Sequence, residues 1–165
     1  ALGVRTFFNM LGPLVNPVMP RHQLLGVYNL KLLRLYHYIC QQNGIDCTIV
    51  HSLDGYDEVS LTSDVKVTSP WGESVYTPGE LGFPTHDPSE LWGGETVEQA
   101  ARIFDAVLEG TASPGQSDCV QANAAFAIRT LDPALSWEEA RAKARESLES
   151  GRAAERFRCF VELNR

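Results

Sequence analysis

Residues 22–52 read HQLLGVYNLKLLRLYHYICQQNGIDCTIVHS, and this segment sets the architecture of the chain. Its two ends, residues 22–28 and 46–52, are short apolar runs of strand length. Between them, over residues 30–43, apolar side chains recur at the spacing of one helix face, and Asn43-Gly44 is a typical helix end, so a helix is predicted over residues 30–43. The members of that face are Leu32, Leu35, Tyr36, Ile39 and Cys40. Strand, helix and strand over about 30 residues predict a βαβ unit with parallel strands.

A hairpin is predicted next along the chain. Two alternating runs, residues 64–69 and 73–77, flank Pro70-Trp71-Gly72, which predicts a tight turn and an antiparallel addition to the sheet. Residues 78–94 are rich in Pro and Gly and predict a long surface loop. Its apolar side chains are expected to dock on the core, with disorder as the alternative. These side chains are Leu81, Phe83, Leu91 and Trp92.

The remainder of the chain is predicted to be helical. Thr96 with Gln99, and Ser136 with Glu139, have the spacing of capping boxes that open two helices. Residues 117–131 predict another helix, and Gly151 separates a short last one. The first of these helices is expected to bury Val97, Ala100, Ala101, Phe104 and Leu108. The fold class is therefore α/β, with part of a mostly parallel sheet flanked by helices, an antiparallel hairpin and a helical C-terminal region.

Composition narrows the functional classes. The 165 residues carry a net charge of −7, which argues against nucleic-acid binding, because a protein that binds the phosphate backbone needs a basic face. No apolar run approaches the roughly 18–20 residues that cross a membrane, and no signal peptide is visible, which predicts a cytoplasmic protein with no membrane partner. The four cysteines lack paired spacing and are expected to be reduced and mostly buried, and the scattered histidines disfavour a zinc site.

Asp57 and Glu58 stand side by side just after the second predicted strand. Ligands of open α/β sheets bind beyond the carboxyl ends of the strands, and Gly55 allows a tight turn before the pair. Adjacent carboxylates suit Mg²⁺, which is commonly held by one or two carboxylates together with substrate phosphates. Acid–base chemistry by the pair and a merely solvated loop are the alternatives that the residues leave open.

Five segments in order resemble the anthranilate phosphoribosyltransferases, from residue 2 to about residue 160. They are RTFFNMLGPLVNP (5–17), QLLGVY (23–28), GYDEVSLT (55–62), GGETVEQAARIFDAVLEG (93–110) and QANAAFAI (121–128). The resemblance covers the second half of that family's chain. It implies the large domain of a nucleoside phosphorylase/phosphoribosyltransferase-type fold.

The resemblance also implies an activity and its residues. Members transfer phosphoribosyl from 5-phosphoribosyl diphosphate to anthranilate in tryptophan biosynthesis and are commonly homodimers through a helical domain. By the same resemblance Asp57 and Glu58 hold Mg²⁺, and Gly12 and Pro13 line the anthranilate channel. Residues 1–20 would be a remnant of the small helical domain and hinge, and residues 21–165 the C-terminal part of the large α/β domain. No catalytic residue is assigned within the 165 residues.

Some features of the family are missing from this sequence. The Gly-rich loop that holds the diphosphate lies upstream in the family and has no counterpart here, so the 165 residues alone are expected to be inactive. Arg5 is either structural or a contact of the anthranilate carboxylate. A pyrimidine nucleoside phosphorylase-like enzyme, a non-catalytic nucleic-acid-binding relative and an independent interaction module are the rival interpretations.

Overall fold

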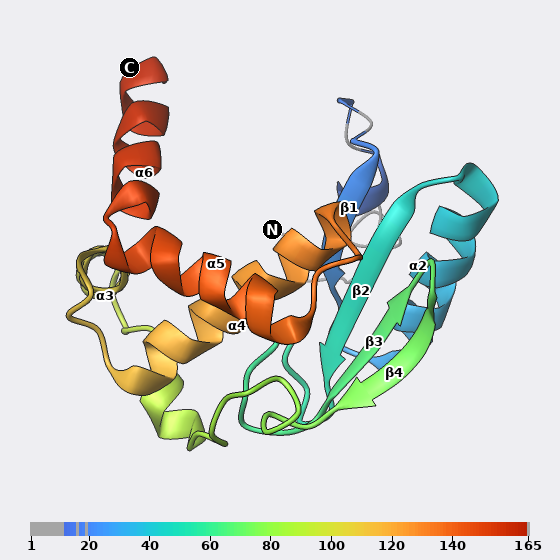
Figure 1. Cartoon of the computed structure of the whole chain (residues 1–165), viewed down its shortest axis with the longest axis horizontal. Coiled ribbons are helices and arrows are strands. Elements are labelled where there is room, and N and C mark those ends of the chain that lie inside the picture. Colours follow the sequence, from blue (N-terminus) through green and yellow to red (C-terminus); the bar gives the residue numbers. More distant parts are fainter. Residues whose placement is uncertain (1–11, 16, 19, 165) are drawn as a thin grey trace, which may run out of the picture.

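The computed structural model describes residues 12–15, 17, 18 and 20–164. The expectation for Arg5 lies outside the described residues, as does the first part of the predicted residue 1–20 remnant. The chain after it forms a four-stranded sheet with helices on both faces (Figure 1). A 3-10 turn, η1 (Gly12–Leu14), precedes the sheet.

The sheet has the strand order β1-β2-β3-β4. Its strands are β1 (His22–Gly26), β2 (Asp46–Ser52), β3 (Val65–Ser69) and β4 (Gly72–Tyr76). β1 and β2 are parallel, whereas β2 with β3 and β3 with β4 are antiparallel. The predicted α/β class, the parallel pair and the hairpin are confirmed. These four strands form a mixed sheet rather than a mostly parallel one, because β2 and β3 are joined by a loop and not by a crossover helix.

The crossover between β1 and β2 is α2 (Leu30–Asn43), with the predicted bounds. The Asn29 side chain caps its first turn, and Gly44 ends it at a φ of +64°, a conformation that favours glycine. The buried face differs in detail from the prediction, because Leu33 is buried and Leu35 is 41% exposed. Tyr36 and Cys40 are buried as expected. The helix is rotated slightly toward Leu33 because it packs against both Cys47 and Ile49 of β2.

Two apolar clusters cover the two faces of the sheet. The first cluster lies between α2 and the face of β2 that α2 covers. The second lies on the opposite face, where α4 (Pro114–Leu131) packs against β3 and the loop after β2. Figure 1 shows α2 on one side of the strands and α4 with α5 on the other. α4 begins three residues before its predicted start, since Ser113 and Gln116 form a capping box and Pro114 occupies the first turn.

The other C-terminal helices are α3 (Val97–Glu109), α5 (Trp137–Glu149) and α6 (Arg152–Leu163), and both predicted capping boxes are present. The predicted buried face of α3 is wrong. Val97 is 81% exposed and Phe104 is 47% exposed, and Val107 is the buried residue of this helix. α3 lies away from the sheet and neighbours α5 and α6, so the described residues leave most of its apolar face uncovered.

The loop between β4 and α3 carries a short 3-10 helix, η2 (Pro88–Leu91). Leu81 and Phe83 dock on the core as predicted, whereas Trp92 is 51% exposed. All four cysteines are free; Cys40 and Cys47 are buried, and Cys159 is exposed. No helix within the described part of the chain is long and apolar enough to cross a membrane.

Candidate metal and substrate site

The loop that follows β2, residues 53–64, carries the carboxylate pair, as the sequence predicted. We call it the carboxylate loop. The Ser52 N–H donates a hydrogen bond to the Tyr56 carbonyl (3.0 Å), and the Gly55 N–H donates to the Ser52 carbonyl (2.9 Å). Gly55 has a φ of +107°, which confirms that a glycine is needed at this turn. The chain therefore reverses immediately beyond the strand and places Asp57 and Glu58 at the carboxyl end of β2, where α/β sheets bind ligands.

Gly26, the last residue of β1, lies directly against this loop. A Cβ atom at Gly26 would meet the Asp57 carbonyl oxygen at 1.5 Å, far inside van der Waals contact. The ends of the two parallel strands are thus joined through backbone contact, and only glycine allows that approach. Sequence reasoning missed this role, although a glycine within an apolar strand is a signal of close backbone approach.

Asn123 of α4 fixes the backbone after the pair. Its side-chain oxygen accepts a hydrogen bond from the Val59 N–H (3.0 Å), and its Nδ2 donates to the Val59 carbonyl (2.9 Å). The Cys119 thiol donates to the same carbonyl at 3.2 Å, and the Ser52 hydroxyl donates to the Glu58 carbonyl at 2.6 Å. Val59 is buried, so these bonds are shielded from water. The sequence signal for Asn123 was an amide between two alanines in an Ala-rich helix.

Asn123→Ala is expected to lower the free energy of unfolding by about 2 kcal/mol, because the buried Val59 N–H loses its partner. Ala is the better helix former, so the helix itself would gain slightly and cannot cause the loss. Urea denaturation of the variant measures the change. Gln121→Ala, two residues earlier on α4, is the control, since its amide donates only to the Ser117 carbonyl of the same helix. Equal losses in both variants would contradict the role given to Asn123.

The two carboxylates are both exposed and lack a cationic partner among the described residues. Within residues 20–164 no Lys, Arg or His nitrogen lies within 4.0 Å of Asp57 or Glu58. Partial desolvation raises the pKa of Glu58, and the neighbouring Asp57 charge raises it further. Burial and the Glu58 charge raise the pKa of the Cys119 thiol to about 12, so this thiol stays protonated and remains a donor. A bound cation would relieve the repulsion between the carboxylates.

His86 holds the other end of the loop. Its backbone N–H donates to the Leu61 carbonyl (2.9 Å), and its ring nitrogens lie 2.9 Å from an Asp118 oxygen and 3.2 Å from a Glu90 oxygen. Leu61 has a φ of +60°, which a leucine adopts at a cost. The imidazole, buried between two carboxylates, therefore ties η2 and α4 to a strained part of the carboxylate loop.

The structure places the other predicted site residues elsewhere. Gly12 and Pro13 belong to η1, and Gly12 lines a cavity of about 510 Å³ beside β1 with Gln23 and Leu25. Glu58 lines a different cavity of about 370 Å³, which also contains Phe104 and Cys119. The described residues thus do not bring Gly12 and Glu58 into one cavity. No cluster of three or more His, Cys, Asp or Glu side chains suited to a metal occurs among the residues that the structure describes.

The layers and the acidic loop beyond β2 are those of an α/β protein, a class in which ligands commonly bind beyond the carboxyl ends of the strands. Comparison with known proteins identifies the family within this class. The chain belongs to the glycosyl transferase family, because residues 1–154 match the a/b domain of that family. The resemblance to the anthranilate phosphoribosyltransferases is confirmed by relatives and by solved structures.

Two relatives show the degree of similarity. The anthranilate phosphoribosyltransferase of Bacteroides fragilis is 62% identical over 164 residues, which are 99% of this chain and 50% of the relative. The enzyme of Cytophaga hutchinsonii is 51% identical over 161 residues, covering 98% of this chain and 49% of the relative. The chain therefore spans about half the length of the curated relatives it matches.

Solved structures agree with the fold. The anthranilate phosphoribosyltransferase of Thermus thermophilus matches with a TM-score of 0.84 at 33% identity, over 98% of this chain and 49% of that chain. The Saccharomyces cerevisiae enzyme in complex with PRPP and Mg matches with a TM-score of 0.86 at 29% identity, over 98% and 46%. These similarities confirm the predicted phosphoribosyltransferase-type α/β fold.

Proposed function

We propose that the complete protein is an anthranilate phosphoribosyltransferase of tryptophan biosynthesis, and that the 165 residues supply its Mg²⁺ ligands. The anthranilate amine attacks C1 of 5-phosphoribosyl diphosphate, the bond from C1 to the diphosphate oxygen breaks, and the amine releases a proton to solvent. The products are phosphoribosyl-anthranilate and diphosphate. The observation that carries the proposal is the adjacency of the Asp57 and Glu58 carboxylates, which have no cationic partner among the described residues and follow the carboxyl end of β2 in a fold shared with this family.

The residues present fit Mg²⁺. Two adjacent exposed carboxylates are hard oxygen ligands. Partial desolvation raises the pKa of Glu58 and the Asp57 charge raises it further, and a divalent ion would offset the repulsion between the two carboxylates. The absence of a third ligand among the described residues suits an ion that keeps water or phosphate oxygens in its other positions. When bound, Mg²⁺ would supply charge neutralisation on the diphosphate leaving group. The yeast relative was solved with PRPP and Mg, which supports this use.

The chain's own contribution is positioning. Gly26, Ser52 and Asn123 hold the loop so that both carboxylates stand beyond β2. Preorganised ligands of this kind lower the barrier because they need not rearrange as charge develops on the leaving group. Gly12 and Pro13 are proposed to border the path of the flat acceptor, which the resemblance supports. No general base is assigned among the 165 residues.

Several features of the complete protein are proposed on the family resemblance. They are a homodimer formed through the helical domain, residues 1–20 as the remnant of that domain and its hinge, and residues 21–165 as the C-terminal part of the large α/β domain. A charged, phosphorylated donor that does not cross membranes unaided supports a cytoplasmic location.

The test is an assay of the complete protein. Formation of phosphoribosyl-anthranilate from anthranilate and 5-phosphoribosyl diphosphate, followed by the change in anthranilate fluorescence, is expected to require Mg²⁺. Thymidine with inorganic phosphate is the control substrate pair and should give no thymine. Phosphorolysis of thymidine without transfer to anthranilate would replace the proposal with a nucleoside phosphorylase.

The titration of Glu58 tests the metal assignment in this chain directly. The folded pKa of Glu58 is raised, so the folded state binds this proton more tightly than the unfolded state does. Protonation of Glu58 therefore stabilises the folded state at pH values below the ordinary pKa of 4.5. This stabilisation is lost as the pH rises through the raised pKa of the folded state. Asp57→Asn is expected to lower the pKa of Glu58, and added Mg²⁺ should lower it in the unsubstituted chain.

The measurement is a carbon-13 NMR titration of the glutamate side-chain carboxyl carbons. Glu109, an exposed residue at the end of α3, is the internal control and should not respond to either change. A Glu58 titration curve that stays in place both in Asp57→Asn and in Mg²⁺ would refute the metal assignment.

A further inference from the structure

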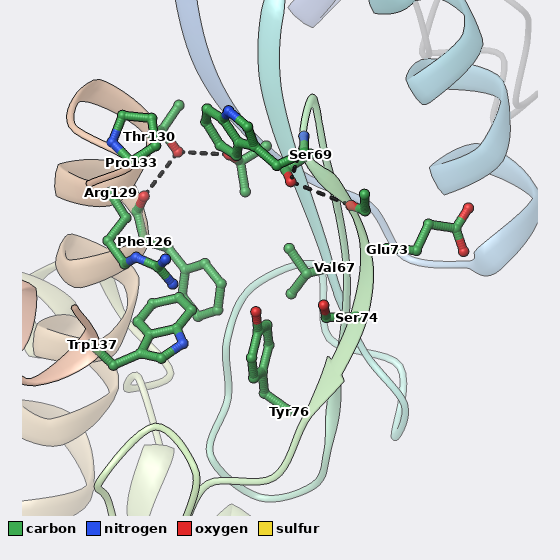
Figure 2. A pocket seen from close by; sticks show the side chains of 13 residues that line it. Val67, Ser69, Glu73, Ser74, Tyr76, Phe126, Arg129, Thr130, Pro133 and Trp137 are labelled. Carbon is green, nitrogen blue, oxygen red and sulfur yellow. Dashed lines mark hydrogen bonds between the residues drawn. The ribbon is translucent and has the colours of Figure 1, made fainter. Parts of the chain in front are cut away.

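A third cavity lies on the α4 and α5 side of the sheet. It has a volume of about 290 Å³ and separates the start of α5 and the last turns of α4 from strands β2, β3 and β4 (Figure 2). Thr48 of β2 and Gly72 at the hairpin turn line it. It extends along the sheet from Thr48, near the amino end of β2, to Tyr76, which pairs with Val65 of β3 and so lies level with Ser52 at the carboxyl end of β2. None of its lining residues belongs to the carboxylate loop.

The rings of Phe126 and Trp137 form the aromatic wall on the helix side of this cavity, and the Tyr76 ring meets them from the strand side. The Trp137 ring lies 4.5 Å from the Phe126 ring and 5.2 Å from the Tyr76 ring, between centroids, and the Tyr76 contact is edge-on. Figure 2 shows Arg129 and Trp137 on the helix side, opposite Tyr76 and Val67 on the strand side. Such rings offer a rigid apolar surface that loses little entropy on binding a flat ligand.

Arg129 brings a positive charge to the same wall, and no carboxylate of the described residues pairs with it. Its guanidinium carbon lies 4.0 Å from the centroid of the Trp137 ring, and its Nε donates to the Leu135 carbonyl at 3.0 Å. These contacts fix the group and leave its two terminal nitrogens free of protein acceptors within residues 20–164. Glu73 also lines the cavity, but it is paired with Lys66 at 2.7 Å and points away from the helix side (Figure 2).

Three further donors line the cavity without a hydrogen bond to the described protein. They are the Tyr76 hydroxyl, the Ser74 hydroxyl and the indole N–H of Trp137. The chain as a whole has a net charge of −7, yet this cavity holds a fixed arginine and three donors that have no acceptor in the described protein. Such a lining favours an anion as the ligand. The Thr130 hydroxyl, by contrast, lies 2.8 Å from both the Thr48 hydroxyl and the Phe126 carbonyl oxygen, so both hydroxyls already have protein partners.

We propose that this cavity binds a small aromatic carboxylate, with the carboxylate on the terminal nitrogens of Arg129 and the ring against the aromatic wall. The guanidinium fork matches a carboxylate, and Arg129 is the sole basic residue of the lining, which favours a single negative charge over a phosphate dianion. The volume is at the low end for small-molecule sites and admits about one or two rings. The inference does not rest on the proposed function.

The three tryptophans make the proposal testable by NMR. Trp71 and Trp137 line the cavity, whereas Trp92 lies in the loop before α3 and serves as the internal control. Benzoate, added to the nitrogen-15-labelled chain, is expected to shift the indole N–H signals of Trp137 and Trp71 in a saturable way and to leave Trp92 in place. Cyclohexanecarboxylate tests the need for a flat ring, and benzyl alcohol tests the need for the charge.

Substitutions then assign the anion contact. Arg129→Gln is expected to weaken benzoate binding at least about tenfold, and Tyr76→Phe about threefold. Arg145→Gln on α5 makes the same charge change at an exposed pair with Glu149 and should leave binding unchanged. Thermal unfolding of each variant establishes that it is folded. If Arg129→Gln unfolds, Tyr76→Phe and the response of Trp137 to the three probes carry the test.

Three results would overturn the proposal. The first is a Trp137 signal that does not saturate with benzoate up to tens of millimolar. The second is an equal response to benzoate, cyclohexanecarboxylate and benzyl alcohol, which would make the cavity a non-specific apolar pocket. A shift of Trp92 with none at Trp137 would place benzoate elsewhere and would also count against it.

Discussion

Replacing Asp57 by Asn and Glu58 by Gln together is expected to lower kcat/KM of the complete protein for phosphoribosyl transfer by on the order of a hundredfold or more. Both substitutions keep the shape of the side chains and remove the two charges that lack a cationic partner in the described structure. The remaining activity should need a much higher Mg²⁺ concentration for half-saturation. Steady-state kinetics at a series of Mg²⁺ concentrations measure both effects.

A charge-matched control separates the site from the net charge of the chain. Asp105→Asn with Glu109→Gln removes the same two charges from the exposed side of α3 and should leave the Mg²⁺ dependence unchanged. Identical Mg²⁺ titration curves for the Asp57/Glu58 double variant and the unsubstituted enzyme would sink the assignment.

Gly26→Ala is expected to be the most damaging single substitution near the site. Its methyl group would lie 1.5 Å from the Asp57 carbonyl oxygen, so either the end of β1 or the carboxylate loop must move. Such overpacking costs about 1–3 kcal/mol of stability, and here the displaced backbone carries a proposed Mg²⁺ ligand. We therefore expect a loss of about 2 kcal/mol in urea unfolding together with a large drop in Mg²⁺-dependent activity in the complete protein.

Gly79→Ala is the matched control for this substitution. A Cβ atom there would find its nearest neighbour, the Thr77 hydroxyl oxygen, at 4.0 Å, which is ordinary contact. It should unfold at the same urea concentration as the unsubstituted chain. A stable Gly26→Ala variant with full activity would show that the backbone contact between β1 and Asp57 has no functional role.

Features encoded by neighbouring residues were predictable. The bounds of α2, the hairpin of β3 and β4, and the capping boxes of α3 and α5 depend on contacts within a few residues. The place of Asp57 and Glu58 was predictable for the same reason, because it needs only the end of β2 and the turn at Gly55. The mixed sheet was less predictable, since strand direction depends on how the loop between β2 and β3 folds back.

The apolar face of α3 shows where periodicity fails. Val97, Ala100 and Phe104 recur at helical spacing, yet all three are exposed in the described structure. Periodicity indicates that a helix has an apolar face, but it does not say which element lies against that face or whether one does. Burial is a property of the neighbours, and α3 has its main contacts with α5 and α6 instead of the sheet.

The amino-acid sequence was thus sufficient for the α/β class, the bounds of most elements, the family and the identity of the carboxylate pair. Tertiary structure was needed for everything that joins distant residues. Asn123 lies 64 positions from Val59, to which it is hydrogen-bonded. Gly26 at the end of β1 contacts Asp57 in the loop after β2. Arg129 meets the aromatic wall only when α4, α5 and the hairpin are assembled. Local signals arise from short-range sterics and hydrogen bonds, whereas these contacts exist only after the layers have packed.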